Sequence, residues 1–266
     1  MAKISHTFPF NSSFGNFSVY KMHGVDRLVI RAKHGPSKET LKNDPAYAKF
    51  RLVQTEFGGA SKARTQVTSA TFGINHLAHP SMGGVLTSIC KIIQGQDSEH
   101  PLGKRSVLFS RYGTILSGID INKSNLFESV VKSPIAFQFD DTSSATVVIP
   151  ALHPGITLTN PWGLPYFRFI ICLGVVVDMA HNGKKYAPVN TSMKQSAVQV
   201  QTEWFSSKSI FQPITQQITL RRRATPGAAA SLLLSIGIEF GIPSGNNVVE
   251  GVKRAGTGKL LGLKAA

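Results

Sequence analysis

The sequence has few acidic residues and little charge of either sign. It holds 14 Asp and Glu against 29 Lys and Arg in 266 residues, and charged residues make up only 16% of the chain. Disordered chains combine high charge with few apolar residues, and the 42% hydrophobic content excludes that class. The formal net charge of +15 favours nucleic acid or another polyanion as a partner. An excess of Lys that only keeps the protein soluble has the same composition, and the sequence leaves this alternative open.

The sequence also lacks the cysteines of a disulfide scaffold and the apolar run of a membrane span. Its two cysteines, Cys90 and Cys172, lie in apolar stretches, which predicts buried free thiols. The most apolar stretch, residues 169–177, is bracketed by Arg168 and Asp178 and is too short to cross a bilayer. No apolar run typical of a signal peptide follows the first residues. We therefore expect a cytoplasmic protein with no membrane partner.

A glycine-rich stretch near the C-terminus resembles a phosphate-binding loop but departs from its pattern. The motif requires a glycine five positions before its second glycine and Ser or Thr after its lysine. In residues 256–259, which read Gly-Thr-Gly-Lys, those two positions are Lys253 and Leu260. A phosphate-binding loop is therefore not expected there.

Two further groups of polar residues fail as catalytic or metal sites. His76 and His79 share one face of a helix, but no acidic residue stands nearby to complete a zinc site. Asp140 and Asp141 would point to opposite faces of a strand, so a turn is their expected role. We therefore expect no catalytic residue, no metal and no cofactor, and hence no enzymatic activity.

Residues 1–103 are predicted to form a hairpin followed by two or three helices. The β-prone stretches 14–22 and 27–33 flank a turn at 23–26. Asp44 is expected to cap a helix that begins at Pro45, and Gly58 and Gly59 are expected to interrupt it. A second helix is expected from about residue 60, and Ser81 is expected to cap a third. The apolar stripe of the third helix would consist of Val85, Ile89, Ile92 and Ile93.

Residues 104–250 alternate between apolar and polar positions over short stretches, which predicts a series of strands. The continuous apolar stretch at 166–177 is expected to be buried on both faces. The other expected strands are 106–109, 115–121, 135–139, 146–149, 198–205, 214–220 and 234–240, with a short helix at 126–132 and a hairpin turn at 181–184.

Many short strands after a helical region predict a β-rich (α+β) fold. The expected architecture is a β-sandwich, of which the jelly roll is one form, with an N-terminal hairpin and two or three helices. Residues 251–266 are glycine-rich and basic, and they are predicted to form a mobile tail. The expected organisation is a hairpin and helical region at 1–103, a sandwich at 104–250 and a tail at 251–266, unless these make one continuous domain.

Eight cations are the candidate nucleic-acid-binding residues. The triplet 221–223 is the only run of three arginines, and a guanidinium group matches two phosphate oxygens. Between residues 21 and 64, ten Lys and Arg stand among four acids, just after several aromatic residues, as in grooves for single-stranded nucleic acid. Solvated turns, salt bridges to another subunit and aromatic core residues remain open alternatives. The eight cations are Lys33, Lys62, Arg64, Arg221, Arg222, Arg223, Lys253 and Arg254.

Five stretches of the sequence resemble stretches of other protein sequences. They are 20–26 (YKMHGVD), 31–38 (RAKHGPSK), 56–59 (EFGG), 118–122 (GIDIN) and 202–205 (TEWF). In these stretches the chain resembles a family of uncharacterised bacterial proteins of about this length, and the resemblance covers most of the chain. It implies a bacterial protein and transfers no catalytic residue.

Three functional hypotheses follow from these features. The first is a structural subunit that assembles with copies of itself into a tube, rod or shell, in which enclosed nucleic acid neutralises the positive charge, as in a helical ribonucleoprotein. The second is a nucleic-acid-binding protein that does not assemble beyond monomers or dimers. The third is a carbohydrate-active enzyme on a β-sandwich, with Trp162 and Trp204 as platforms for a sugar ring.

Overall fold

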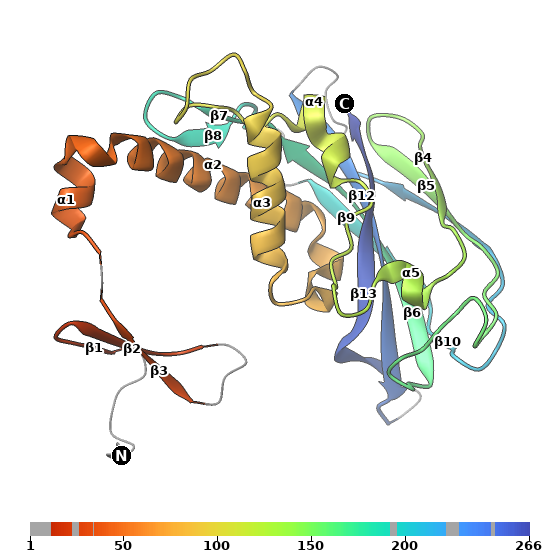
Figure 1. Ribbon diagram of the computed structural model, residues 1–266. Helices are drawn as coiled ribbons and strands as arrows, with labels where there is room; N and C mark the ends of the chain where they lie inside the picture. The colour runs from red at the N-terminus through yellow and green to blue at the C-terminus, as the bar shows by residue number, and fades with distance from the viewer. Residues whose placement is uncertain (1–11, 23–26, 34, 192–195, 222–228, 246–247) are drawn as a thin grey trace. The chain divides into compact units, whose positions relative to one another are not determined.

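The structure is a computed structural model that describes residues 12–22, 27–33, 35–191, 196–221, 229–245 and 248–266 (Figure 1). The chain divides into two compact units, Met1–Arg51 and Leu52–Ala266. The fold is strand-rich, with several sheets and a few helices, which confirms the predicted β-rich α+β class.

The first unit contains a small antiparallel sheet and two short helices. The strands β1 (Ser12–Phe14), β2 (Phe17–Lys21) and β3 (Leu28–Ala32) pair in the order β1-β2-β3. The predicted hairpin therefore gains a third strand, and its turn at 23–26 lies outside the described residues. After the sheet come α1 (Lys38–Asn43) and the 3-10 helix η1 (Pro45–Tyr47).

Both short helices of the first unit begin at a side-chain cap. The hydroxyl of Ser37 accepts a hydrogen bond from the Thr40 N–H at the start of α1, at 3.0 Å. Asp44 Oδ1 accepts one from the Ala46 N–H at the start of η1, at 2.9 Å, and Pro45 follows as the first helical residue. The predicted capping role of Asp44 is confirmed, although the helix that it caps is a single 3-10 turn.

The helix α2 (Ala48–Ala70) begins in the first unit and ends in the second, without a break at Gly58 or Gly59. The predicted interruption is therefore wrong. Gly59 is buried, and a Cβ atom there would lie 2.8 Å from ring atoms of Tyr186, so this glycine admits an aromatic ring against the helix. The packing of α2 in the second unit outweighs the low helix propensity of glycine.

A five-stranded antiparallel sheet is the centre of the second unit. Its strands are β6 (Tyr166–Val177), β9 (Ala197–Gln201), β10 (Phe205–Ser206), β12 (Ala230–Pro243) and β13 (Val249–Ala265). They pair in the order β10-β6-β12-β13, and β9 also pairs with β6. A second sheet has the order β11-β5-β4, and a hairpin joins β7 to β8. These strands are β4 (Ala136–Phe139), β5 (Ser144–Ile149), β7 (Met179–His181), β8 (Tyr186–Pro188) and β11 (Ile214–Thr219).

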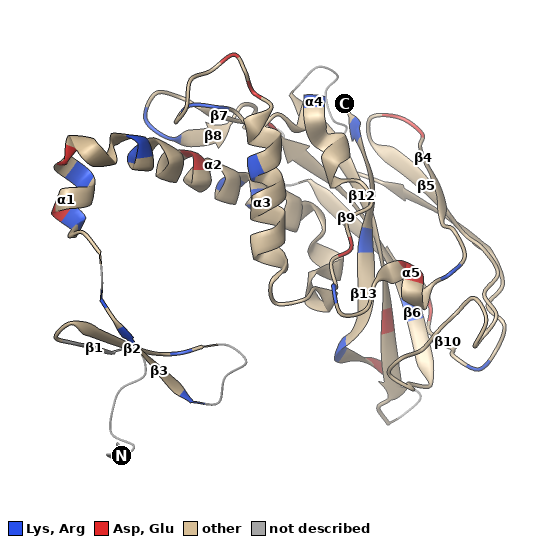
Figure 2. Ribbon diagram, in the orientation of Figure 1, with Lys and Arg blue, Asp and Glu red and all other residues tan. Residues whose placement is uncertain are grey.

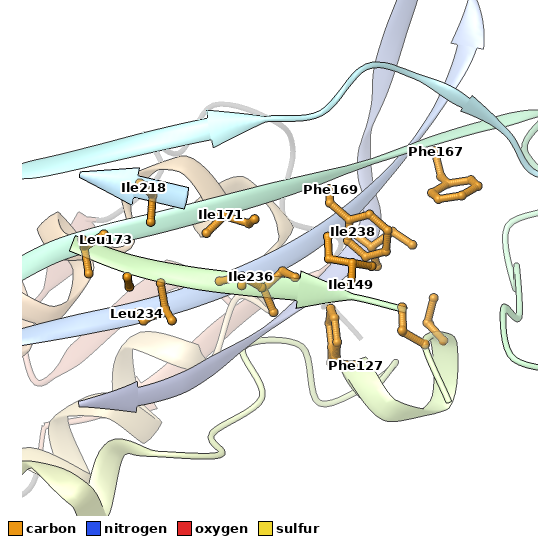
Figure 3. Packing of buried hydrophobic residues seen from close by; sticks show 14 of the residues in the cluster. Phe127, Ile149, Phe167, Phe169, Ile171, Leu173, Ile218, Leu234, Ile236 and Ile238 are labelled. Atoms are coloured by element: carbon orange, nitrogen blue, oxygen red, sulfur yellow. The ribbon is translucent and has the colours of Figure 1, made fainter. Parts of the chain in front are cut away.

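The main sheet is buried on both faces, so the second unit has three layers. On one face, Phe169 and Ile171 of β6 join Ile149 of β5 and Ile218 of β11 in a core between the two sheets (Figure 3). On the other face, side chains of β6 that alternate with these pack against α2 and the helices that follow it. This double burial explains the continuous apolar sequence of β6, as predicted.

Helices cover the face of the main sheet that is turned away from β4 and β5 (Figure 1). They are α2, η2 (Phe72–Leu77), α3 (Met82–Gly95), α4 (Phe109–Tyr112) and η3 (Gly113–Leu116). The short helix α5 (Phe127–Val130) lies beside β13. The predicted stripe of α3 is half right. Ile89 and Ile93 are buried as predicted, but Val85 and Ile92 are exposed (43% and 53%), and Leu86 and Cys90 are buried in their place.

Two of the predicted strands are absent as regular strands. Residues 106–109 form one bridge, between Val107 and Met179, before α4 begins. Residues 115–121 start in η3 and then run along the free edge of β13, where the Ile121 N–H donates to the Gly258 carbonyl at 2.9 Å. Both segments are apolar because they cover sheet edges and helices, which gives the same sequence pattern as a strand.

The C-terminal segment is not a mobile tail. Residues 251–265 belong to β13, which pairs with β12 along most of its length. Its glycines permit close approach, since a Cβ atom at Gly256 would lie 2.4 Å from the Ile238 carbonyl oxygen, and one at Gly262 would lie 2.8 Å from the Phe137 ring. In β13, glycine occurs where neighbouring atoms leave no room for a side chain. The glycine content had instead predicted a flexible tail, and that prediction is wrong.

Candidate nucleic-acid interface

Lys and Arg are distributed along the described elements of both units (Figure 2), and the predicted cations belong to several of these elements. Lys33 belongs to the first unit, where it is exposed and its Nζ donates to the Gly15 carbonyl at 3.0 Å. Arg221 is exposed just after β11, and Arg222 and Arg223 lie outside the described residues. The remaining four occupy two places in the second unit, one on α2 and one on β13.

The two cations on α2 are engaged with the protein itself. Lys62 Nζ donates to the Tyr186 carbonyl at 2.9 Å and so ties α2 to β8. The guanidinium of Arg64 lies close to Gly83 at the start of α3, and its Nε is buried without a hydrogen-bond partner among the described residues. Both side chains therefore contribute to the packing of α2 against its neighbours.

The two cations on β13 occur in a bulge. Glu239 of β12 pairs with Gly256 and Gly241 pairs with Gly251, so residues 252–255 of β13 stand opposite a single residue of β12. Ala255 in this bulge is buried in the core between the sheets, whereas Lys253 and Arg254 are exposed. Bulges of this kind change the direction in which side chains leave a strand.

Arg254 adopts an unusual backbone conformation within the bulge. Its φ angle is +65°, in the left-handed region that favours glycine and that few other residues adopt. Strained conformations of this kind often occur where a side chain has a functional position. Among the described residues, no carboxylate forms a salt bridge with Arg254, so its charge is available to a ligand.

Arg254 lines a pocket of about 290 Å³. The other walls come from residues 77–80, which connect η2 to α3, and from the loop that follows Ile121. None of its lining residues is a carboxylate. Its polar lining consists of His79, Asn122, Ser124, Asn125 and Arg254.

The loop of the pocket is fixed to β13 by hydrogen bonds. Asn122 Oδ1 accepts from the Ser124 N–H at 3.0 Å, and Asn122 Nδ2 donates to the Gly256 carbonyl at 3.0 Å. The hydroxyl of Thr257 donates to the Asn125 carbonyl at 2.6 Å. Buried or half-buried groups therefore hold the loop, and the pocket is formed before any ligand binds.

Glu239, Arg168 and His76 form a second cluster of polar side chains, in which the residues contact one another. The buried carboxylate of Glu239 contacts His76 Nε2 and Arg168 Nε, each at 2.8 Å. Burial raises the pKa of Glu239, but the hydrogen bonds from His76 and Arg168 outweigh this and lower it below its usual range. The guanidinium of Arg168 also lies 4.5 Å from the centre of the Trp204 ring. This group is an internal ion cluster, and His76 belongs to it.

The other candidate residues, Asp141, Trp162 and the two cysteines, contribute to turns or to the core. Asp141 Oδ1 accepts hydrogen bonds in the turn between β4 and β5, as predicted, and these bonds lower its pKa to about 2. Trp162 packs on Phe240 in the core, with ring centres 5.1 Å apart. Both cysteines are buried and free, as predicted, and burial raises the pKa of Cys90 to about 12 and that of Cys172 to about 11.

The small sheet of the first unit has an apolar face that is exposed among the described residues. In its sheet, Val19 stands opposite Ile30 and Lys21 opposite Leu28, so these residues and Phe17 lie on one face. Phe17, Leu28 and Ile30 are 49%, 41% and 53% exposed. No described residue of β2, β3, α1 or η1 is buried. A small sheet normally buries such a face against another surface.

Arg254 can be recognised as a candidate from the sequence, but the pocket around it cannot. The pocket joins residues 77–80, 122–125 and 254, which lie far apart in the sequence, and no spacing rule connects them. The apolar face of the first unit had a partial signal. In β2, Phe17 and Val19 alternate with Ser18 and Tyr20, but in β3 Val29 separates Leu28 from Ile30.

Comparison of the chain with protein-family models, with curated proteins and with solved structures finds no match. Over the described residues, no helix has the length and apolar character to span a membrane, and no three His, Cys, Asp or Glu side chains cluster as metal ligands do.

Proposed function

We propose that this protein is a structural subunit that assembles with copies of itself and encloses nucleic acid. The observation that carries the proposal is the apolar sheet face of the first unit, on which Phe17, Leu28 and Ile30 are exposed among the described residues. An apolar sheet face without a core of its own gains free energy when a second surface removes it from water.

The partner that suits this face is a second copy of the chain. The second unit also exposes apolar side chains, among them Val85 and Ile92, which are seven residues apart on α3 and so lie on the same side of that helix. Contact between unlike surfaces of identical chains joins head to tail, and it produces rings or helical filaments from one kind of subunit.

The charge of the chain requires a counterion in such an assembly. Each copy has a net charge of +15, and residues 1–51 contain nine Lys and Arg against three Asp and Glu. Subunits that carry this charge repel one another when they pack closely, and a polyanion inside the assembly removes the repulsion. Nucleic acid supplies regularly spaced negative charge and is the partner that we assign.

Particle size in solution tests the assembly. We expect the wild-type protein to form large particles in light scattering and electron microscopy. Phe17→Ser combined with Ile30→Ser should convert these particles to monomers, because it removes two apolar side chains from the exposed face. Tyr20→Ser combined with Val29→Ser is the matched control, since it changes the same two strands on the opposite face and should leave the particles large.

Two results would contradict the assembly. One is a monomeric wild-type protein at concentrations of tens of micromolar, and the other is an equal effect of the two double variants. The nucleic acid is tested separately, by the 260/280 nm absorbance ratio of protein purified without nuclease, before and after high salt. A ratio typical of pure protein in large particles would retain the assembly and remove the nucleic acid from the proposal.

A further inference from the structure

The pocket beside Arg254 has the properties of an anion site. Its polar lining presents a guanidinium, an imidazole, a hydroxyl and amide groups, and none of its lining residues is a carboxylate. Arg254 itself has no salt bridge to a described carboxylate. A guanidinium group donates two parallel hydrogen bonds to the oxygens of a phosphate, and a hydroxyl group can donate a further one.

The conformation of the bulge supports a role for this particular side chain. Arg254 stands at φ +65°, where glycine would be the favoured residue, and the bulge is the place where β13 leaves its register with β12. An arginine in a conformation that favours glycine is expected where its side chain is needed. The loop opposite is already held by Asn122 and Thr257, so the pocket needs no rearrangement to receive a ligand.

The shape and the rest of the lining indicate more than a bare phosphate ion. The pocket volume of about 290 Å³ is close to the lower limit for small-molecule sites. Ala78 and Pro80 provide apolar surface, and His79 provides a ring whose Nδ1 already contacts the Ser81 hydroxyl at 2.8 Å. A planar or apolar body that carries one phosphate group fits this combination.

We infer that this pocket binds one nucleotide through its phosphate group, with Arg254 as the principal anion ligand and Ser124 and Asn125 as further polar contacts. The inference rests on the proposed function in that a nucleotide of the enclosed strand is one source of this phosphate, and a free mononucleotide is the other. In both cases the chemistry of recognition is the same.

Titration calorimetry on the full-length protein, freed of nucleic acid in high salt, tests the inference. The probes are uridine 5′-monophosphate, uridine, inorganic phosphate and a uridine octanucleotide. We expect the monophosphate to bind, inorganic phosphate to compete with it, and uridine to bind at least about tenfold more weakly. Equal binding of uridine and its monophosphate, or no binding of either, would overturn the inference.

Arg254→Gly is the decisive variant, because glycine suits φ +65° and the fold is preserved. It should weaken binding of the monophosphate at least about tenfold, and Asn125→Ala should weaken it to a smaller extent. Lys264→Gln is the control, since it removes one positive charge from the same strand at an exposed position outside the pocket, and it should have no effect. Equal binding by the wild type and Arg254→Gly, or an equal loss in Lys264→Gln, would refute the assignment.

The two sources of phosphate give different results with the octanucleotide. If the pocket holds a nucleotide of a bound strand, Arg254→Gly should lower the slope of log affinity against log salt by about 0.7, the share of one phosphate contact. An unchanged slope with lost mononucleotide binding would assign the pocket to a free nucleotide. Particle size is measured in parallel, so that a monomer that binds the monophosphate would end the proposal of assembly and leave this inference standing.

Discussion

The carboxylate of Glu56 offers the sharpest test of the energetics of this fold. It is fully buried on α2, and it accepts hydrogen bonds from the Gly103 N–H at 2.9 Å and from Nε and Nη2 of Arg105 at 2.7 Å each. Lys91 Nζ on α3 also contacts it. Burial alone would raise the pKa of Glu56, but the hydrogen bonds from Arg105, Lys91 and Gly103 outweigh this and lower it from 4.5 to about 2.

This shift sets the size and the direction of a pH effect. The unfolded chain binds the proton more tightly than the folded protein, so the contribution of Glu56 to stability is complete above about pH 4.5. It is lost as the pH falls toward 2, and the lowering of the pKa from 4.5 to about 2 corresponds to about 3 kcal/mol. We therefore expect the free energy of unfolding to fall by about this amount through Glu56 alone.

The variant Glu56→Gln isolates this contribution, because the amide has the same shape and does not titrate. We expect it to lower the free energy of unfolding by about 3–5 kcal/mol at pH 7, since Lys91 and Arg105 lose their carboxylate. Urea unfolding followed by circular dichroism, at steps from pH 7 to pH 2, measures the difference between wild type and variant, which should shrink by about 3 kcal/mol toward acid.

The same substitution at an exposed ion pair is the control. Glu99 contacts Arg111 Nη1 at 2.8 Å, but both side chains are mostly exposed, so Glu99→Gln should leave the unfolding midpoint unchanged at every pH. The explanation fails if the gap between wild type and Glu56→Gln stays constant from pH 7 to pH 2. It also fails if Glu99→Gln reproduces the gap.

Two further predictions concern backbone positions of the second unit. Gly59→Ala should lower the free energy of unfolding by about 1–3 kcal/mol because its Cβ would meet the Tyr186 ring, whereas Gly58→Ala, with open space around it, should raise it by about 0.5–1 kcal/mol. Urea unfolding measures both, and the packing argument is wrong if the two variants change stability in the same direction. Arg254→Gly should raise the free energy of unfolding by about 1 kcal/mol, because it relieves a left-handed conformation at φ +65°. A lower thermal midpoint than that of the wild type would contradict this.

The sequence predicted the strands whose pattern arises from their own burial. The stretch 166–177 coincides with β6, and its continuous apolar sequence correctly indicated burial on both faces. Residues 135–139 and 214–220 likewise contain β4 and β11. In β11 the polar residues Thr215, Gln217 and Thr219 are exposed and Ile218 is buried, so the alternation in the sequence reflects the two sides of the strand.

Predictions from the sequence failed at glycines, because glycine occurs both in flexible segments and where neighbouring atoms come too close for a side chain. In β13 the glycines allow the backbone of β12 and side chains such as Phe137 to approach, and in α2 Gly59 admits Tyr186. The partner in each case is distant in the chain, so no local rule distinguishes this glycine from one in a flexible tail. The same limit applies to the pocket, whose three lining segments lie far apart in the sequence.

The buried hydrophobic residues belong to the second unit, so variants can test the stability of the fold and the assembly of copies separately. Among the described residues, every buried hydrophobic side chain lies between Ala60 and Leu260, and none belongs to the first unit. Polar substitutions at Phe17 and Ile30 therefore leave the core of the second unit unchanged, so a smaller particle in that variant reports a lost interface between copies. Glu56→Gln has the opposite effect, because it lowers the free energy of unfolding of the second unit and does not change the apolar face of the first. If the Phe17 and Ile30 variant also lost the unfolding transition of the second unit, the two properties would be coupled and the exposed sheet could not be the assembly surface that we propose.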